Sequence, residues 1–213
     1  MSTVTDRGVH ASLGSPTQVE ASADVAGSAR IGVGTRVWHL AQVCEGATLG
    51  RGCVVGRGAY VGPDVVVGDH VKIQNYALVY APAELEDGVF VGPAVVLTND
   101  AHPRAVGVDG QPRSAGEWQP VRVLVREGAS LGARVVCVAP VTIGRWAMVG
   151  AGAVVVSDVP DFALMVGVPA RRVGWVGRAG TPLHRVGGSA VWRCADTHQR
   201  YVEEGGLLRE ING

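Results

Sequence analysis

The stretch VGRGAYVGPDVVVGDHVK, residues 55–72, repeats a six-residue pattern three times without a slip. The same pattern runs from Val19 to His102, where fourteen consecutive hexads begin with Val, Ile or Leu. A period of six over this length fits neither an amphipathic helix nor a simple alternating strand. It predicts a hexapeptide parallel β-helix, in which short strands wind around a prism.

The repeat also predicts which side chains form the core. The aliphatic first positions point into the prism, and so do the fifth positions, where only Ala, Thr, Cys or Val occurs. Glycine often follows the first position, where it relieves the backbone at a corner. With 31 glycines, 47% hydrophobic residues and 5% aromatic residues, the composition favours a core of small aliphatic side chains joined by tight turns.

One segment, VVLTNDAHPRAVGVDG at residues 95–110, interrupts this regularity. The hexads resume at Val125, 28 residues after Leu97, which is four more than a multiple of six. The chain must therefore leave the repeat and rejoin it, and the polar segment 99–120 predicts an external loop. Long loops on regular scaffolds are usually functional, so we expect the chemistry here.

Charge and cysteine content narrow the class of protein. Basic and acidic residues number 19 each, so the balance predicts neither a nucleic-acid nor a membrane partner. The four cysteines form no C-x-x-C pair and favour buried thiols in a reducing compartment. The first residues lack the apolar core of a signal peptide, and no apolar run is long enough to span a membrane. We therefore expect a cytoplasmic protein.

These features also predict the domain organisation. We expect an N-terminal extension at residues 1–18, a β-helix at 19–170 that carries the external loop at 99–120, and a C-terminal cap and hairpin at 171–213. A cap is physically required, because the open end of a β-helix exposes unpaired strand edges.

The hexads and the motif GVPAR, residues 167–171, resemble the hexapeptide-repeat acyltransferases. That resemblance implies a left-handed parallel β-helix, an exception to the usual right-handed crossover, in which three hexads form one triangular coil of eighteen residues. Residues eighteen apart then stack at about one strand spacing, ~4.8 Å. The expected fold class is all-β, with the external loop and a small C-terminal cap.

Longer motifs are similar to a narrower family. They are VWHLAQV (37–43), VKIQNYALVY (71–80), LEDGVFVGPAVVLTNDAHPR (85–104), GASLGARVVCVAPVTIG (128–144) and VGAGAVVVSDVPDFALMVGVPARRVGWVGRAG (149–180). Together they resemble bacterial N-acetyltransferases that acetylate the 3-amino group of UDP- or dTDP-linked amino sugars, in particular UDP-2-acetamido-3-amino-2,3-dideoxyglucuronate. The resemblance implies a homotrimer with active sites between subunits, acetyl-CoA as co-substrate and no metal.

Three positions depart from this family's pattern, namely Arg57, Tyr76 and His102. The family has Gln at the first of them and often Asn at the other two. These positions are plausible contacts of the sugar or its charge. The resemblance therefore leaves open which sugar and which nucleotide carrier the protein uses.

Coils of eighteen residues predict two outward columns. His39, Arg57 and Asn75 form a polar column that we expect to bind the substrate, although a solvated face would also explain it. A second column of small residues would leave a slot for the pantetheine arm of CoA, although ordinary turn packing would also require small residues. The residues assigned to CoA are Ala133, Gly150, Ala151 and Pro169, with Arg171 and Arg172 near its phosphates.

The loop supplies the candidate catalytic residues. Attack of an amine on a thioester needs a neutral amine, an acceptor for its proton and a donor for the oxyanion. A histidine side chain has a reference pKa of ~6.5, so His102 could be the base, although the departing CoA thiolate could also take the proton. Asn99 could orient the amine or form a turn, and Asp100 could bind His102 or the ammonium. Arg104 could pair with a phosphate or a carboxylate, or remain solvated.

Other functions remain open at this stage. The first alternative is O-acetylation of a sugar or antibiotic hydroxyl, because a hydroxyl needs a base such as His102 more than an amine does. A zinc-dependent carbonic anhydrase on the same prism would need three converging histidines, but His39, His70 and His102 occupy different columns. A non-catalytic β-helix subunit is the third possibility, and the polar loop and GVPAR argue against it.

Overall fold

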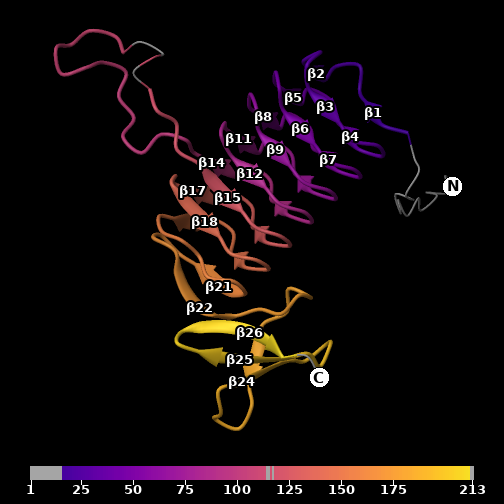
Figure 1. The fold of residues 1–213 in the computed structure, drawn as a ribbon, viewed down its shortest axis with the longest axis vertical. Coiled ribbons are helices and arrows are strands. Elements are labelled where there is room, and N and C mark those ends of the chain that lie inside the picture. Colours follow the sequence, from indigo (N-terminus) through magenta and orange to yellow (C-terminus); the bar gives the residue numbers. More distant parts are fainter. Residues whose placement is uncertain (1–15, 114–115, 117, 212–213) are drawn as a thin grey trace, which may run out of the picture.

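The computed structural model describes residues 16–113, 116 and 118–211, so residues 1–15 of the predicted extension lie outside the described residues. Short strands wind into a triangular prism, which is followed by a separate four-stranded sheet (Figure 1). Each wall of the prism is one parallel sheet whose neighbouring strands come from successive coils. The predicted left-handed parallel β-helix with an external loop and a C-terminal cap is confirmed.

Three sheets form the walls of the prism. The first wall contains β1 (Gln18–Val19), β4 (Arg36–Val37), β7 (Val54–Val55), β10 (Lys72–Ile73), β13 (Phe90–Val91), β16 (Ser130–Leu131), β19 (Met148–Val149), β21 (Ala163–Val166) and the antiparallel β22 (Arg171–Trp175). The second wall contains β2 (Asp24–Val25), β5 (Gln42–Val43), β8 (Tyr60–Val61), β11 (Leu78–Val79), β14 (Val96–Leu97), β17 (Val136–Cys137) and β20 (Val154–Val155). The third wall contains β3 (Arg30–Ile31), β6 (Thr48–Leu49), β9 (Val66–Val67), β12 (Glu84–Leu85), β15 (Val123–Val125) and β18 (Val141–Ile143).

The register explains how the loop is inserted. In regular coils the partner lies eighteen residues away, as in the pairing of Val54 with Lys72. Across the loop, Glu84 pairs with Leu124, forty residues later, so the loop inserts 22 residues. The insertion sits between β14 and β15 and projects away from the prism (Figure 1). The wall pairing therefore continues unbroken on both sides of the loop.

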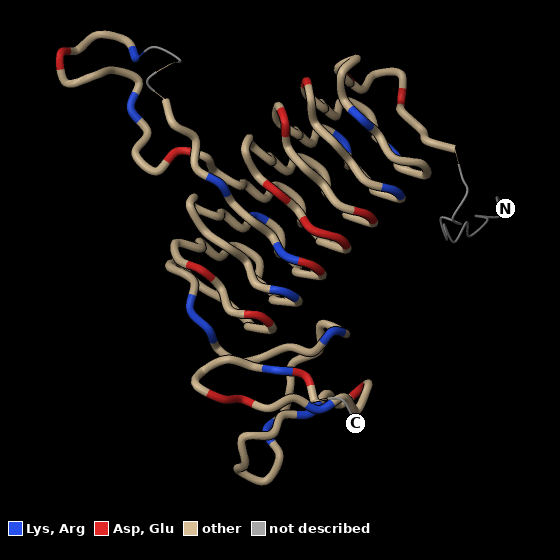
Figure 2. The backbone as a smooth tube through the Cα atoms, in the orientation of Figure 1, with Lys and Arg blue, Asp and Glu red and all other residues tan. Residues whose placement is uncertain are grey.

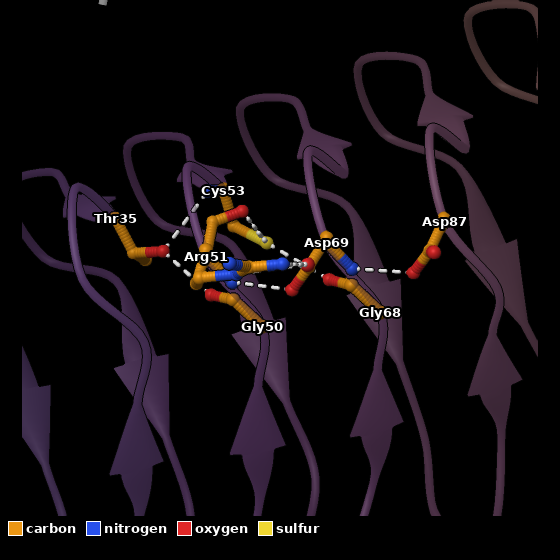
Figure 3. Close-up of polar contacts among 7 residues, drawn as sticks. All are labelled: Thr35, Gly50, Arg51, Cys53, Gly68, Asp69 and Asp87. Carbon is orange, nitrogen blue, oxygen red and sulfur yellow. Dashed lines mark hydrogen bonds and ion pairs between the residues drawn. The ribbon is translucent and has the colours of Figure 1, made fainter. Parts of the chain in front are cut away.

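The core consists of the first and fifth positions of the hexads, as predicted. Val61 and Val67 are at most 2% exposed. Thr35 is the one polar residue buried in the described part of the chain. Its hydroxyl donates to Gly50 O at 2.8 Å and accepts the Cys53 N–H at 2.9 Å (Figure 3). The hydroxyl is satisfied on both sides, so its burial carries no penalty for an unmade bond.

We name the turns corner 1, after first-wall strands, corner 2, after second-wall strands, and corner 3, after third-wall strands. Charged residues recur at successive turns of the prism (Figure 2). At corner 3, Asp87 Oδ1 accepts the Asp69 N–H and Asp69 Oδ1 accepts the Arg51 N–H, both at 2.7 Å (Figure 3). At corner 1, Asn75 Oδ1 accepts the Arg57 N–H at 2.9 Å. A short side-chain acceptor in one coil thus satisfies an outward N–H of the coil before it.

The cap is larger than the single hairpin considered from the sequence. It is a four-stranded antiparallel sheet of β23 (Leu183–Arg185), β24 (Val191–Cys194), β25 (Arg200–Glu204) and β26 (Leu207–Ile211). Tyr201 of β25 is fully buried, and its ring lies 5.3 Å from that of Phe162 at the end of the prism. The cap therefore packs onto the prism through aromatic contact. In the part of the chain that is described, no helix has the length and apolarity needed to cross a membrane.

Candidate functional site

A groove runs along corner 1 in the N-terminal half of the prism. It encloses about 300 Å³ and is lined by Trp38, His39, Val54, Gly56, Arg57, Gln74 and Asn75. The three residues predicted to bind substrate, His39, Arg57 and Asn75, therefore share one surface. Trp38 is 42% exposed and adds an indole face to it. The groove combines an aromatic surface, a guanidinium and carboxamides, which suits a polar ligand that carries negative charge.

The two predicted columns are one column. Because Phe90 pairs with Ser130 across the loop, Ala133 stacks on Pro93 and continues the line that begins at His39. Backbone bonds confirm the continuity, since Arg134 N donates to Pro93 O and Gly152 N to Ala133 O, each at 2.8 Å. Corner 1 is thus polar at its N-terminal end and lined by small residues from Pro93 to Ala151.

Pro169 does not stack in this column, contrary to the eighteen-residue expectation. The last coil is two residues shorter, because Met148 pairs with Leu164 only sixteen residues later. Residue 167 therefore lies below Ala151, and Gly150 faces Val166. The chain then turns, and Ala170 N donates to Val154 O at 2.8 Å. The small-residue part of corner 1 therefore ends with Ala151 and with Gly167, which stacks on Ala151 in the last coil.

His39 has two neighbours that the sequence reading missed. Ser22 Oγ lies 3.0 Å from His39 Nδ1, and Glu20 Oε2 lies 3.5 Å from Nε2. Both residues come from the preceding coil. His39 and Ser22 are exposed, and Glu20 is half-buried. Glu20 and Ser22 lie eighteen residues before Trp38 and Leu40, the two neighbours of His39. The rule that residues eighteen apart stack could therefore have found them. They fix the orientation of the imidazole at the mouth of the groove.

The base of the loop is anchored at corner 2. Asn99 Nδ2 donates to Ala81 O at 2.7 Å, and Val121 N donates to Asn99 O at 2.9 Å, which joins the two ends of the loop. Asp100 Oδ1 accepts the His102 N–H at 2.8 Å. The side chain of His102 is therefore presented from a local turn that its neighbour Asp100 stabilises.

The predicted catalytic and substrate-binding residues lie at different corners. Asn99, Asp100 and His102 leave from corner 2, whereas His39 and Arg57 line corner 1. A wall of six residues separates two corners by roughly 20 Å at ~3.3 Å per residue. A single chain therefore does not bring the two sets together. Arg104 extends with the loop and donates to Pro103 O at 2.9 Å.

The two arginines of GVPARR differ in their surroundings. Arg172 lies 3.9 Å over the Trp175 ring, donates to Gly206 O at 3.2 Å and stands 3.5 Å from Glu203 Oε1. Arg171 is exposed and donates to Ala170 O at 2.9 Å, and it forms no ion pair within the described residues. Arg172 is therefore occupied in joining β22 to the cap, which leaves Arg171 as the more available cation.

His39, His70 and His102 do not converge within one chain. His39 lies at corner 1, His70 at corner 3 and His102 in the loop at corner 2. Among the residues that the structure describes, no group of three or more His, Cys, Asp and Glu side chains is arranged to hold a metal ion.

Known proteins with similar sequences are acetyltransferases. The chain is 42% identical over 90 residues to dTDP-3-amino-3,6-dideoxy-alpha-D-galactopyranose 3-N-acetyltransferase from Aneurinibacillus thermoaerophilus, which covers 42% of this chain and 45% of that relative. It is 38% identical over 88 residues to serine acetyltransferase from Escherichia coli (strain K12), which covers 41% of this chain and 31% of that relative. The chain thus matches less than half the length of either relative. No protein-family model matches it.

Among solved structures, the UDP-N-acetylglucosamine acyltransferase of Bacteroides fragilis 9343 superimposes with a TM-score of 0.60. The match covers 76% of this chain and 62% of that one at 15% identity, which supports the fold alone. Fold and sequence together define the chain as a hexapeptide-repeat β-helix protein, and the matched stretches are similar to acetyltransferases. Within that class its matched stretch is similar to a nucleotide-sugar 3-N-acetyltransferase, as the sequence motifs predicted.

Proposed function

We propose that this protein is an acetyl-CoA-dependent N-acetyltransferase that acetylates the amino group, at C3, of a UDP- or dTDP-linked amino sugar. The observation that carries the proposal is the single column of corner 1. Its polar end, from His39 to Asn75, offers contacts to a charged sugar nucleotide, and its small end, from Pro93 to Ala151, offers a slot for pantetheine. The reacting amine and thioester would meet where the two ends join.

We propose that the working unit is a homotrimer packed through the second wall. The outward positions of that wall are apolar from the third coil onward and only partly exposed; they are Tyr60, Leu78, Val96, Val136 and Val154. A continuous apolar stripe on a sheet surface favours burial against another protein surface. The second wall lies between corners 1 and 2, so packing around it brings corner 2 of one protomer toward corner 1 of the next.

The loop supports this arrangement. Its exposed apolar residues Val106, Val108 and Trp118 have exposed fractions of 45%, 111% and 43%. Such side chains on an extended loop favour contact with a second surface. We propose that the loop covers corner 1 of the neighbouring protomer and brings Asn99, Asp100 and His102 to the groove.

The chemistry follows from that geometry. The neutral sugar amine attacks the thioester carbonyl carbon, the new C–N bond forms, and the C–S bond breaks as CoA leaves. The amine proton goes to His102 or to the departing thiolate. The oxyanion is stabilised by backbone N–H groups of the corner 1 turns. Arg57 and Arg104 pair with the diphosphate or a sugar carboxylate, and Arg171 pairs with a phosphate of CoA.

We place the reaction in the cytoplasm. All four cysteines are buried and free, which suits a reducing compartment.

The activity is tested by release of free CoA thiol when acetyl-CoA is offered with UDP- and dTDP-3-amino sugars, with mass spectrometry of the product. We expect amide formation that depends on the 3-amino group, and a fall in kcat/KM of about tenfold or more for Arg57→Ala, since a charged contact is lost. Turnover of hydroxyl sugars alone would overturn the amine assignment.

The assembly is tested by sedimentation of two matched variants. Val136→Glu places a carboxylate on the second wall and should yield monomers, whereas Val66→Glu makes the same change on the third wall and should leave the trimer intact. A trimer that survives Val136→Glu, or dissociates equally in both variants, would contradict packing through the second wall.

A second candidate is O-acetylation of a sugar or antibiotic hydroxyl. The observation that favours it is the presentation of His102 from the Asp100 turn, because a hydroxyl must lose its proton as it attacks. Its distinguishing product is an ester, which hydroxylamine cleaves, whereas the amide survives.

A further inference from the structure

Trp38 presents an aromatic surface at the N-terminal end of the corner 1 groove. It is 42% exposed and lines the groove together with Gly56 and Gln74. The pairing of β4 with β7 and of β7 with β10 places these three residues in one column, in successive coils. Because Gly56 has no side chain, a recess of two coil spacings, ~10 Å from backbone to backbone, separates Trp38 from Gln74. We refer to it as the Trp38 recess.

The indole of Trp38 is left without a partner among the described residues. Trp146, Trp175 and Trp192 each lie under an arginine, and the Nε1–H of Trp192 also donates to Glu203 Oε2 at 3.0 Å. The side chain of Trp38 has neither a cation over its ring nor a hydrogen bond in the part of the chain that the structure describes. An exposed indole beside an open recess suits contact with a planar ligand group.

The covalent order of a sugar nucleotide determines which of its parts can reach this recess, and this step rests on the proposed function. The amino sugar must lie near Asn75 and Pro93, where the polar end of corner 1 meets the small end, because the thioester arrives through the small end. The diphosphate and then the nucleoside extend from the sugar toward the N-terminal coils. Arg57 lies one coil before Asn75, whose Oδ1 accepts its N–H at 2.9 Å, and Trp38 lies in the coil before Arg57. Successive coils, ~4.8 Å apart, therefore follow the order of sugar, diphosphate and base.

We propose that the Trp38 recess holds the nucleobase of the sugar nucleotide, with the base stacked on the indole of Trp38 and its polar edge hydrogen-bonded to the Gln74 carboxamide. Bases stack on aromatic side chains whatever their identity, because every base has a π-face. A carboxamide carries both donors and an acceptor, so it can pair with the adjacent N–H and C=O groups of uracil or thymine. The recess thus contributes affinity for the nucleoside, whereas Arg57 contributes affinity for the diphosphate.

The test is calorimetric titration of the full-length protein with UDP, with dTDP and with inorganic pyrophosphate, which has the diphosphate but lacks the base. We expect saturable binding of UDP or dTDP by the wild-type protein, and Trp38→Ala should weaken it about tenfold or more. Trp38→Phe retains a ring for stacking and should recover most of that affinity. Pyrophosphate should bind the wild-type protein at least about tenfold more weakly than UDP, because it cannot use the recess.

Leu40→Ala is the matched control, because Leu40 is an exposed apolar side chain of the same turn that does not line the groove. It should leave the Kd for UDP unchanged within about twofold. Circular dichroism verifies that both exposed substitutions leave the fold intact.

The titration contains neither acetyl-CoA nor an amine, so it separates the recess from the proposed reaction. UDP binding that requires Trp38, without acetylation of any amine, would support the recess and refute the reaction. Absence of UDP and dTDP binding by the folded wild-type protein, wild-type affinity in Trp38→Ala, or equal weakening in Leu40→Ala would overturn the recess. A Trp38→Ala variant that dissociates in sedimentation while the wild type stays assembled would also overturn it, because Trp38 would then lie in a subunit contact.

Discussion

Asn99 Nδ2 donates a 2.7 Å hydrogen bond to Ala81 O, one coil earlier on the same corner. This bond fixes the first residue of the loop to the rigid prism at the point where the repeat ends. The Asn99 carbonyl simultaneously accepts the Val121 N–H from the returning end of the loop. One residue therefore sets both the departure and the return of a segment that carries the candidate base.

Replacing Asn99 should loosen the loop without unfolding the prism. Asn99→Ala removes the donor to Ala81 O and should lower the free energy of unfolding by about 1 kcal/mol. Limited proteolysis should cut the 99–120 segment faster than in wild type, and kcat should fall more than KM rises. Gln111→Ala, within the loop but away from its base, is the control. Unchanged proteolysis of the Asn99 variant would show that this bond does not hold the loop.

His102→Ala should lower kcat by ~10²-fold or more if His102 takes the amine proton. Its backbone N–H, which bonds to Asp100, is retained in the variant, so the turn persists. His70→Asn, at corner 3, is the matched histidine control and should leave kcat unchanged. A loss of less than about threefold in His102→Ala would instead assign the proton to the CoA thiolate.

Gly92 is one of the glycines whose replacement should disturb the stacking of coils. An added Cβ would lie 2.6 Å from Leu131 O and 2.8 Å from Ala133 N, which are backbone atoms of the next coil. Gly92→Ala should therefore destabilise the protein by about 2 kcal/mol. Gly27→Ala has no atom within 4 Å of the new carbon and should be neutral or slightly stabilising, because it restricts the unfolded chain. Urea unfolding of the pair measures the difference, and equal stabilities would refute the close contact.

Asp69 should contribute to stability at neutral pH and lose that contribution in acid. The hydrogen bond from the Arg51 N–H, followed by that from the Arg51 side chain, holds the pKa of Asp69 below its usual value of 3.8. Because the folded-state pKa is the lower one, the stabilisation is present above pH 3.8 and disappears as the pH falls through the folded-state pKa.

The free energy of unfolding of Asp69→Asn should consequently be lower than that of wild type at pH 7. The difference between these two free energies should narrow below pH 3.8. Urea titrations at several pH values check this. A difference in the free energy of unfolding that stays constant with pH would mean that the charge of Asp69 does not contribute to stability.

The hexad pattern was sufficient to predict the prism because each position of the repeat meets the same surroundings in every coil. Val61 and Val67 are buried for the same reason, and both could be assigned to the core from their place in the hexad. The loop was also predictable, since Leu97 and Val125 are out of phase with each other. A periodic sequence indicates periodic contacts, and a break in the period indicates an insertion.

The column of corner 1 could be predicted only in two pieces. The predicted loop of residues 99–120 matches the 22 inserted residues, but only the pairing of Phe90 with Ser130 shows that all of them leave the coil, so that Ala133 stacks on Pro93. The shortened last coil, which moves Pro169 out of the column, is likewise a property of strand pairing between Met148 and Leu164. Partners such as Ser22 of His39 and Glu203 of Arg172 depend on where side chains meet across coils or on the cap.

The amino-acid sequence by itself determined the prism, the interruption and the resemblance to acetyltransferases, because those are encoded by local repetition and short motifs. Tertiary structure alone decided that polar and small residues share one corner and that the catalytic candidates leave from another. These relationships arise from the pairing register between distant strands, which is set by backbone hydrogen bonds over the whole coil rather than by any one segment.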